Sequence, residues 1–297
     1  MKINETTILD DRGFIEINGS DSKDFLQNIV TNDIEKASNN LTLFSSIFTP
    51  QGKYLYEFFI LKIKDRYLLE CEKEVVDEII KIFNFYKLRS KINLINASTK
   101  YKSIIISLEK FKEISKAEIL KGSTMSYNDE KIYIDPRNQK LGAKIISKSD
   151  NVKKLIKNLN LEIVDKEKYY TESFYLGIPQ VNLNKLKEKI FGIENNLDEL
   201  GGIDFKKGCY IGQENTSRIK LRNKLRRRIL PIKNIEGEVH ENDIIRYKKL
   251  EVGKIIIGKP YTFALIKVAD PNLEEFINDE LICGKSKIKI LKPDFIK

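Results

Sequence analysis

The chain has 297 residues, of which 41% are hydrophobic and 32% are charged, with 53 Lys and Arg against 43 Asp and Glu. This apolar fraction suffices for a packed core and excludes wholesale disorder, and no run approaches the roughly 18 apolar residues of a membrane-spanning helix. Acidic residues stand near the amino terminus where a secretion signal has its apolar core, so we expect a cytoplasmic protein of two or three domains.

The cysteine and histidine content limits the possible metal chemistry. Cys71, Cys209 and Cys283 are odd in number and widely spaced, which argues against a disulfide framework. A zinc site needs three or four clustered ligands, and an iron–sulfur cluster within one chain usually needs four thiolates. We therefore expect no self-contained metal site, although one thiol could share a cluster with another protein. The single histidine, His240, lies in a polar stretch typical of an exposed loop.

The first hundred residues have the pattern of an α+β domain. Apolar alternation predicts strands, and apolar residues at helical spacing predict an amphipathic helix over 75–86. Gly19-Ser20-Asp21 is typical of a helix start, and Pro50-Gln51-Gly52-Lys53 of a hairpin turn. The predicted strands cover residues 13–17, 41–49, 54–63, 67–71 and 92–95.

A second α+β unit and a terminal β-barrel are predicted next. The second unit has strands at 103–107, 133–135 and 143–146 and helices near 108–116, 151–159 and 166–176. After residue 224 short strands and turns dominate, as in a small barrel. Its predicted strands are 226–232, 244–247, 252–257, 263–268, 281–283 and 288–291. The predicted domains are 1–100, 101–224 and 225–297, and the chain can cross between the first two.

Residues 200–228 carry most of the functional information. Cys209 follows a pair of lysines and stands between Gly208 and Gly212. Because an ammonium group favours a nearby thiolate, Lys207 is expected to activate Cys209. Gln213 and Glu214 add an amide and a carboxylate suited to an amide-like heterocycle. The alternative is a structural turn with a buried, inert cysteine.

A basic run follows directly. Its cations recur at every second position, so a strand would place five of them on one face. Like charges on one face repel each other, which favours an anion opposite them. The candidates are a polyglutamate tail, a phosphate backbone and an acidic partner protein, and a solvated face is the ordinary alternative. The five cations are Arg218, Lys220, Arg222, Lys224 and Arg226, and Arg227 and Arg228 extend the run.

The string LGGIDFKKGCYIGQE at 200–214, with Ser217-Arg218 after it, resembles the signature of the YgfZ family. That family belongs to the folate-binding superfamily of the glycine-cleavage T-protein, an aminomethyltransferase. Other elements of this chain are similar to family elements in the same order. They are Gly19-Ser20-Asp21, Thr31-Asn32-Asp33, Thr49-Pro50-Gln51-Gly52-Lys53, Leu88-Arg89-Ser90-Lys91 and Gly177-Ile178-Pro179.

The resemblance implies a three-domain clover-leaf of two α+β (ferredoxin-like) units and a C-terminal β-barrel, with tetrahydrofolate or a derivative in a central hole. It implies a role in assembly or repair of [4Fe–4S] enzymes, including radical enzymes that modify tRNA. The implied partners are folate, iron–sulfur assembly proteins and client enzymes, with tRNA contact and no membrane. By the resemblance, the motif residues are Lys207, Gly208, Cys209, Tyr210, Gly212, Gln213, Glu214 and Arg218, and the folate-contact candidates are Arg12, Tyr169 and Glu172.

Two other functions stay open. T-proteins carry paired aspartates in the first hairpin, where this chain has Tyr56-Glu57, so Glu57 would have to orient or deprotonate the amine in aminomethyl transfer. The loss of that pair argues against this enzyme. A tRNA-binding module that uses residues 218–228 predicts strongly salt-dependent binding. We favour a folate-binding iron–sulfur assembly factor over an enzyme, with Cys209 as its functional thiol.

Overall fold

The structure is a computed structural model, and it describes residues 1–115 and 118–296. The chain forms two compact units, each assembled from separate stretches of sequence. The first unit holds residues 1–47, 56–169 and 200–211, and the second holds 48–55, 170–199 and 212–297. The segment KGCYIGQE is divided after Ile211, so its two ends belong to different units. The limits of the three predicted domains stay a prediction.

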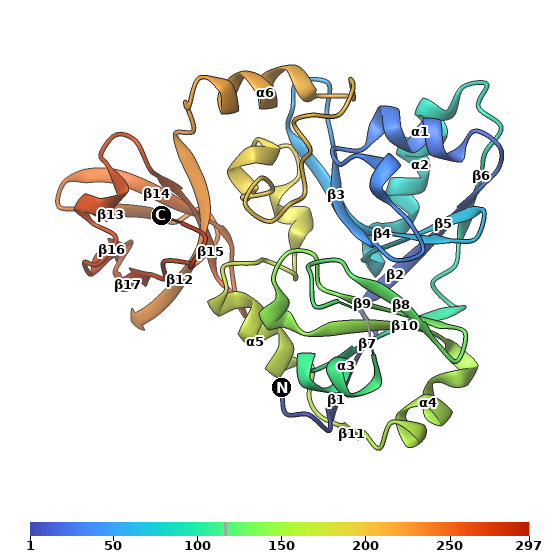
Figure 1. The fold of residues 1–297 in the computed structure, drawn as a ribbon. Coiled ribbons are helices and arrows are strands. Elements are labelled where there is room, and N and C mark those ends of the chain that lie inside the picture. The colour runs from blue at the N-terminus through green and yellow to red at the C-terminus, as the bar shows by residue number, and fades with distance from the viewer. Residues whose placement is uncertain (116–117, 297) are drawn as a thin grey trace. The chain divides into compact units, whose positions relative to one another are not determined.

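One sheet of the first unit combines the amino-terminal strand with the strands of residues 101–148 (Figure 1). Helices α3 (Leu108–Ile114) and α4 (Val152–Asn158) pack on one face of it, where Phe111 and Leu155 join a cluster with Ile104 and Ile145. The strands, in order across the sheet, are β11 (Glu162–Ile163), β1 (Glu5–Leu9), β7 (Tyr101–Ile106), β10 (Ala143–Lys148), β9 (Glu130–Ile134) and β8 (Thr124–Tyr127).

The other sheet of the first unit carries helices α1 (Ser22–Ile29) and α2 (Val76–Lys87) on one face. Phe83 of α2 meets Phe25 and Phe58 edge to face, with ring centroids 5.6 and 6.2 Å away. On the opposite face Phe59 packs 5.7 Å from Tyr133 of the first sheet, so the two sheets face each other. The strand order is β3 (Leu43–Phe48), β4 (Tyr54–Ile63), β5 (Arg66–Glu72), β2 (Arg12–Asn18) and β6 (Asn93–Asn96).

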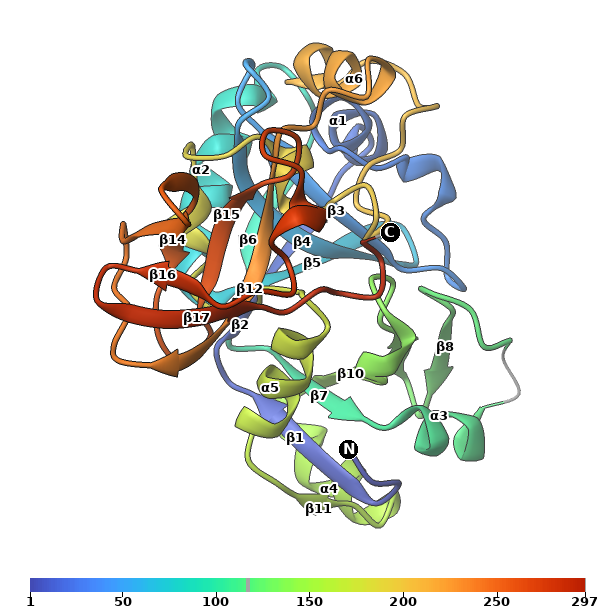
Figure 2. The ribbon, with the colours of Figure 1, turned by 90° about the vertical axis from the view of Figure 1, so that its left-hand side faces the viewer.

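The second unit contains the predicted barrel, which is closed (Figure 2). Its interior is filled by alternating aliphatic side chains such as Val252, Ile255 and Ile266. The strand order is β12 (Arg227–Glu236), β15 (Phe263–Lys267), β14 (Leu250–Ile257), β13 (Ile244–Tyr247), β16 (Leu281–Cys283) and β17 (Ser286–Ile290). A mixed α+β fold with a closed C-terminal barrel is therefore confirmed.

The remaining elements are two helices and several short turns. Helix α5 (Glu167–Tyr175) crosses from the first unit to the second, and α6 (Gln213–Leu221) precedes the barrel. No helix of the described ranges is long and apolar enough to cross a membrane. The 3₁₀ turns are Ile34–Lys36, Lys73–Val75, Gln139–Leu141, Ser149–Asn151, Leu183–Leu186, Gly192–Asn195 and Leu273–Glu275.

Most predicted elements are found within a few residues, but the strand predicted through the basic run is wrong. Helix α6 covers residues 213–221, and β12 begins only at Arg227. The cations of this helix are placed by ion pairs and not by a strand face. Arg218 pairs with Glu214 one helical turn earlier, and Lys220 pairs with Asp198, which lies outside the helix. The five cations therefore do not share one strand face.

Three strands were not predicted, namely β1, β8 and β11. Thr6 and Thr7 interrupt the apolar alternation of β1, and both are buried because they lie between neighbouring strands. The helix predicted near 108–116 ends at Ile114, and residue 116 lies outside the described residues. Residue 297, the end of the predicted barrel domain, lies outside them as well.

Candidate functional site

The loop that carries Cys209 is anchored to the end of helix α1 by Lys207. The Lys207 ammonium donates to the carbonyl oxygens of Gln27, Val30 and Asn32 at 2.7, 2.6 and 3.0 Å. The last carbonyls of a helix have no partner inside it, and the negative end of the helix dipole favours a cation there. Lys207 thus caps α1 from a position about 180 residues further along the chain.

This capping limits what Lys207 can do for Cys209. An ammonium has three N–H donors, and carbonyl oxygens accept all three. Burial lowers the pKa of Lys207 to about 8, against the opposing influence of Asp33 and Asp204. Lys207 therefore has no hydrogen bond left for a thiolate, and its predicted role as activator reduces to the through-space effect of its charge.

Further hydrogen bonds tie the same segment to the turn after α1. The Thr31 hydroxyl donates to the Gly202 carbonyl at 2.6 Å, and the backbone carbonyl of Thr31 accepts from the Asp204 N–H at 3.0 Å. The Ile211 N–H reaches the carbonyl of Asn28 at 3.3 Å. The Thr31-Asn32-Asp33 element and residues 201–211, far apart in sequence, therefore form one hydrogen-bonded structure within the first unit.

Cys209 is exposed between these anchors. Its neighbour Gly208 is exposed too, and a Cβ built there would meet nothing within 4 Å. Cys71 and Cys283 are buried, and burial raises their pKa to about 12 and about 11. The alternative of a buried, inert Cys209 does not hold, because the loop presents this thiol to solvent while its ends are fixed.

The other end of the segment packs against the first hairpin, and this packing requires glycine. Gly212 has a φ of +83°, and a Cβ there would lie 2.4 Å from the carbonyl oxygen of Thr49. Gly52, also at positive φ, would place a Cβ 3.1 Å from the Gly212 carbonyl oxygen. The Asn215 amide donates to the Gln51 carbonyl at 2.8 Å. Backbone thus meets backbone where the two motifs touch in the second unit.

The residues expected to contact folate divide between the two units. Glu214 is exposed and paired with Arg218, while Gln213 and Glu172 are half-buried, and all four belong to the second unit. Arg12 and Tyr169 belong to the first unit. The structure brings Lys207, Gly208, Cys209 and Tyr210 together with the end of α1, and Gly212 with the hairpin, but each group within its own unit.

Arg12 is used inside the first unit. It is 6% exposed, and its Nε donates to Glu70 at 3.1 Å. Lys144 and the Tyr133 hydroxyl donate to the same carboxylate at 2.9 and 2.6 Å. Burial by itself raises the pKa of Glu70, but the two cations and these hydrogen bonds outweigh it and hold that pKa at about 2. The carboxylate is therefore ionised between two buried cations.

Tyr169 is also interior, at 1% exposed. Arg137 forms a two-pronged ion pair with Asp135 at 3.0 and 2.8 Å and stacks 4.6 Å from the Phe59 ring centroid. Glu57, which aminomethyl transfer would need, is 8% exposed and faces the same guanidinium. Arg12 and Tyr169 are thus both buried, and their roles in folate contact stay a prediction.

Sequence reasoning missed the buried ionic groups Glu70, Lys144, Asp135 and Arg137. A signal was available, because Glu70 and Lys144 interrupt otherwise apolar predicted strands, where a charge is stable only if it is paired. In the described part of the chain, no three His, Cys, Asp or Glu side chains gather as metal ligands would.

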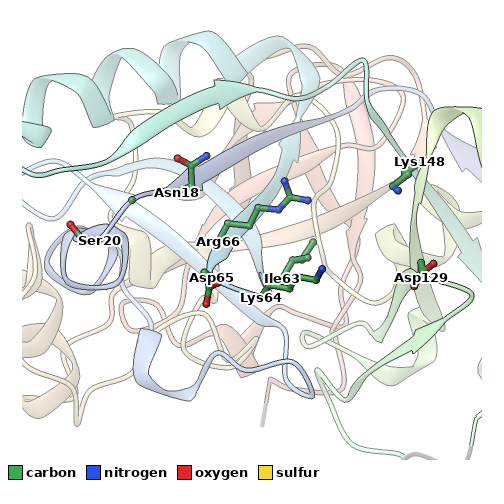
Figure 3. Close-up of a pocket in the computed structure, with 9 residues that line it drawn as sticks. Asn18, Ser20, Ile63, Lys64, Asp65, Arg66, Asp129 and Lys148 are labelled. Carbon is green, nitrogen blue, oxygen red and sulfur yellow. The ribbon is translucent and has the colours of Figure 1, made fainter.

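A cavity of about 910 Å³ lies in the first unit beside the turn between β4 and β5 (Figure 3). Its wall alternates in charge, with Lys64, Arg66 and Lys148 against Asp65 and Asp129. Arg66 is moreover paired with Glu16 at 3.3 Å. The charges of this cavity largely balance among themselves, and no residue of the KGCYIGQE segment lines it.

The fold as a whole is that of aminomethyltransferase T. The crystal structure of the glycine cleavage system aminomethyltransferase T from Bartonella henselae superposes with a TM-score of 0.76 and 12% identity, over 98% of this chain and 86% of that one. No protein-family model matches the chain.

Several similar curated proteins carry the name iron-sulfur cluster assembly factor IBA57. The chain is 28% identical over 284 residues to the mitochondrial homolog of Neurospora crassa, covering 93% of this chain and 62% of that protein. It is 30% identical to the Pyricularia oryzae homolog over 230 residues, 76% of this chain and 56% of that protein. The mouse protein is 24% identical to this chain over 245 residues, which cover 77% of this chain and 66% of the mouse protein.

Two consequences follow from these comparisons. The chain spans about three-fifths of the length of the first two relatives. All three are named as mitochondrial proteins, so the expectation of a cytoplasmic location is wrong. That expectation rested on acidic residues near the amino terminus, which argue against a secretion signal but do not distinguish the cytoplasm from the mitochondrion.

Proposed function

We propose that this protein is an iron–sulfur cluster assembly factor of the YgfZ and IBA57 type, and that Cys209 is its functional thiol. The observation that carries the proposal is the exposed Cys209 on a loop fixed at both ends, by Lys207 and by Ile211, to the end of α1. The names of the relatives, which match up to 93% of the chain, support the assembly role.

A thiol presented in this way suits transfer or repair better than cluster storage. A single thiolate offers one ligand, and structural clusters are usually held by four. An exposed, anchored thiolate can bind an iron of another protein's cluster and release it again, because exchange needs access and low reorganisation. The clients would be [4Fe–4S] enzymes, including radical enzymes that modify tRNA, and contact with tRNA itself is part of the proposal.

Complementation tests this role. Mouse cells that lack their own factor would receive the chain fused to a mitochondrial leader, as the natural sequence, as Cys209→Ser and as Lys206→Gln. Lys206 is exposed and lies three residues from Cys209, so its variant controls for a surface change in the same segment. We expect the natural chain and Lys206→Gln to restore [4Fe–4S] enzyme activity and Cys209→Ser to fail. Full rescue by Cys209→Ser at equal protein level refutes the role of the thiol.

Folate binding is the second part of the proposal, and the fold supports it. Of the expected contacts, Glu172 and Gln213 are half-buried and Arg218 is exposed, so these are the residues that we assign to tetrahydrofolate. Equilibrium dialysis of the full chain with tetrahydrofolate tests this assignment. We expect Glu172→Gln to weaken retention about tenfold, as for loss of a charge-assisted hydrogen bond, and exposed Glu167→Gln on the same helix to leave it unchanged. No retention of tetrahydrofolate by the natural chain contradicts the folate part alone.

A further inference from the structure

The proposed function uses only Arg218 of the basic run and leaves its other cations without a role. Pairing separates its members into two groups. Four cations have carboxylate partners: Arg218 with Glu214, Lys220 with Asp198, Arg227 with Glu194 and Arg228 with Glu199. Within residues 1–115 and 118–296, Arg222, Lys224 and Arg226 form no ion pair.

Two of these three unpaired cations line one cavity of the second unit. Helix α6 ends at Leu221, Asn223 takes a φ of +48°, and the Lys224 N–H closes the turn on the Ile219 carbonyl at 3.0 Å. This turn carries Lys224 and Arg226 into the wall of a cavity of about 800 Å³, which Ile219 of α6 and Arg227 of β12 also line. A volume of this size fits a small molecule.

Strand β15 adds a third cation, Lys267, to the wall of this cavity, next to the cations of the basic run. Lys267 of β15 stands directly opposite Arg227 of β12, and it too lines the cavity. Like charges directly opposite on paired strands destabilise a sheet. Buried Glu194 neutralises Arg227 through a bond of 2.9 Å, but Lys267 has no ion pair in the described residues. Lys267 is half-buried, and an anion in the cavity would offset its repulsion with Arg227.

The same wall has an apolar part. Phe191, Ile219 and Leu225 line the cavity, and Lys53 lies 3.9 Å from the Phe191 ring centroid on a cation–π contact. Against the unpaired Lys224, Arg226 and Lys267 stands one carboxylate without an ion pair, Asp270, which leaves an excess of two positive charges. A ligand with two negative charges and a ring-sized apolar part therefore complements the charge and the apolar side chains of this wall.

We propose that this cavity binds a small dianion attached to an apolar ring, either a phosphate monoester or a dicarboxylate. Lys224, Arg226 and Lys267 hold the anion, and Phe191 and Leu225 pack on the ring. A nucleic acid fits less well, because its affinity depends on many phosphate contacts along a basic surface, whereas four of the seven cations here are already paired. No residue of the cavity belongs to the KGCYIGQE segment, so the site is independent of the proposed function.

Calorimetric titration of the full chain at low ionic strength tests this site with three probes. Adenosine 5′-monophosphate carries a phosphate dianion on an aromatic body, phthalate carries two carboxylates on a ring, and adenosine carries no charge. We expect one-to-one binding of at least one dianion and at least tenfold weaker binding of adenosine. Binding of the monophosphate alone assigns a phosphate ligand, and binding of phthalate alone assigns a dicarboxylate. Absence of binding by both dianions overturns the proposal, as does equal binding of adenosine.

Variants locate the binding. Arg226→Gln and Lys267→Gln should each weaken the dianion about tenfold, the usual loss for one charge-assisted hydrogen bond. Lys233→Gln removes the same charge from an exposed position on β12 outside the cavity and should leave the affinity unchanged. Circular dichroism confirms that each variant is folded, and Arg226→Lys should retain most of the affinity. Equal weakening by Lys233→Gln and Arg226→Gln, for a dianion or for tRNA, assigns the effect to general surface charge and overturns the site.

Discussion

Replacing Lys207 by methionine tests whether the KGCYIGQE segment is anchored through the end of α1. Methionine keeps the apolar stem but removes three hydrogen bonds to the carbonyls of Gln27, Val30 and Asn32, two of them buried. A buried acceptor left without a donor costs about 1–3 kcal/mol. Since the ammonium is itself partly desolvated, as its lowered pKa shows, part of this cost is recovered. We expect the free energy of unfolding to fall by about 3 kcal/mol.

Urea denaturation followed by circular dichroism measures this loss, because the chain contains no tryptophan for fluorescence. The loss corresponds to a melting temperature lowered by roughly 5–10 °C. The matched control is Lys206→Met, which removes the same charge from the exposed neighbour and should stay within about 0.5 kcal/mol of the natural chain. Equal stability of the two variants refutes the capping role of Lys207.

Three further predictions concern packing, thiol exposure and acid stability. Gly212→Ala should lower the free energy of unfolding by about 2–4 kcal/mol, because alanine is strained in the left-handed backbone and its Cβ would overlap the Thr49 carbonyl oxygen. Gly208→Ala should change the free energy of unfolding by less than about 0.5 kcal/mol, because its Cβ would meet no neighbour. Equal losses for the two variants in urea titrations would contradict the packing role of Gly212. Iodoacetamide should modify Cys209 alone in the native protein and all three cysteines in urea, as counted by mass spectrometry; a second modified thiol without denaturant would show that burial does not protect the others. Glu70 has a pKa lowered from 4.5 to about 2, so its stabilisation is present above pH 4.5 and is lost as the pH falls toward 2, by about 3 kcal/mol. Glu70→Gln should lose about 3–5 kcal/mol at pH 7 and lack this acid dependence, and parallel pH–stability curves of the two proteins would count against it.

Much of the fold was predictable because its signals are local. The barrel strands β13 and β16 coincide with the predicted ranges 244–247 and 281–283, since short apolar alternations between turn residues have few other solutions. Helix α2 was found from its apolar spacing. The basic run misled because alternation over 218–226 resembles a strand, while the pairs of Arg218 with Glu214 and Lys220 with Asp198 that hold it as a helix combine local and distant contacts.

The candidate site was only half predictable for the same reason. The residue types around Cys209 indicated a reactive thiol. The glycines indicated close backbone approach, which the structure confirms at Gly212 but not at Gly208, where a Cβ would meet nothing within 4 Å. The partners of Lys207 were out of reach of sequence reasoning. An ammonium can equally serve a neighbouring thiolate or distant carbonyls, and only the path of the chain decides which of them lies within hydrogen-bond distance.

The sequence by itself determined the mixed α+β class, the terminal barrel and the segment that carries the chemistry, because apolar periodicity and turn residues act over a few positions. The tertiary structure alone decided that Cys209 is exposed while Cys71 and Cys283 are sealed, that Glu70 stays ionised between Arg12 and Lys144, and that the basic run divides into paired and unpaired cations. Burial and charge pairing depend on groups that are distant in sequence, so no local pattern contains them.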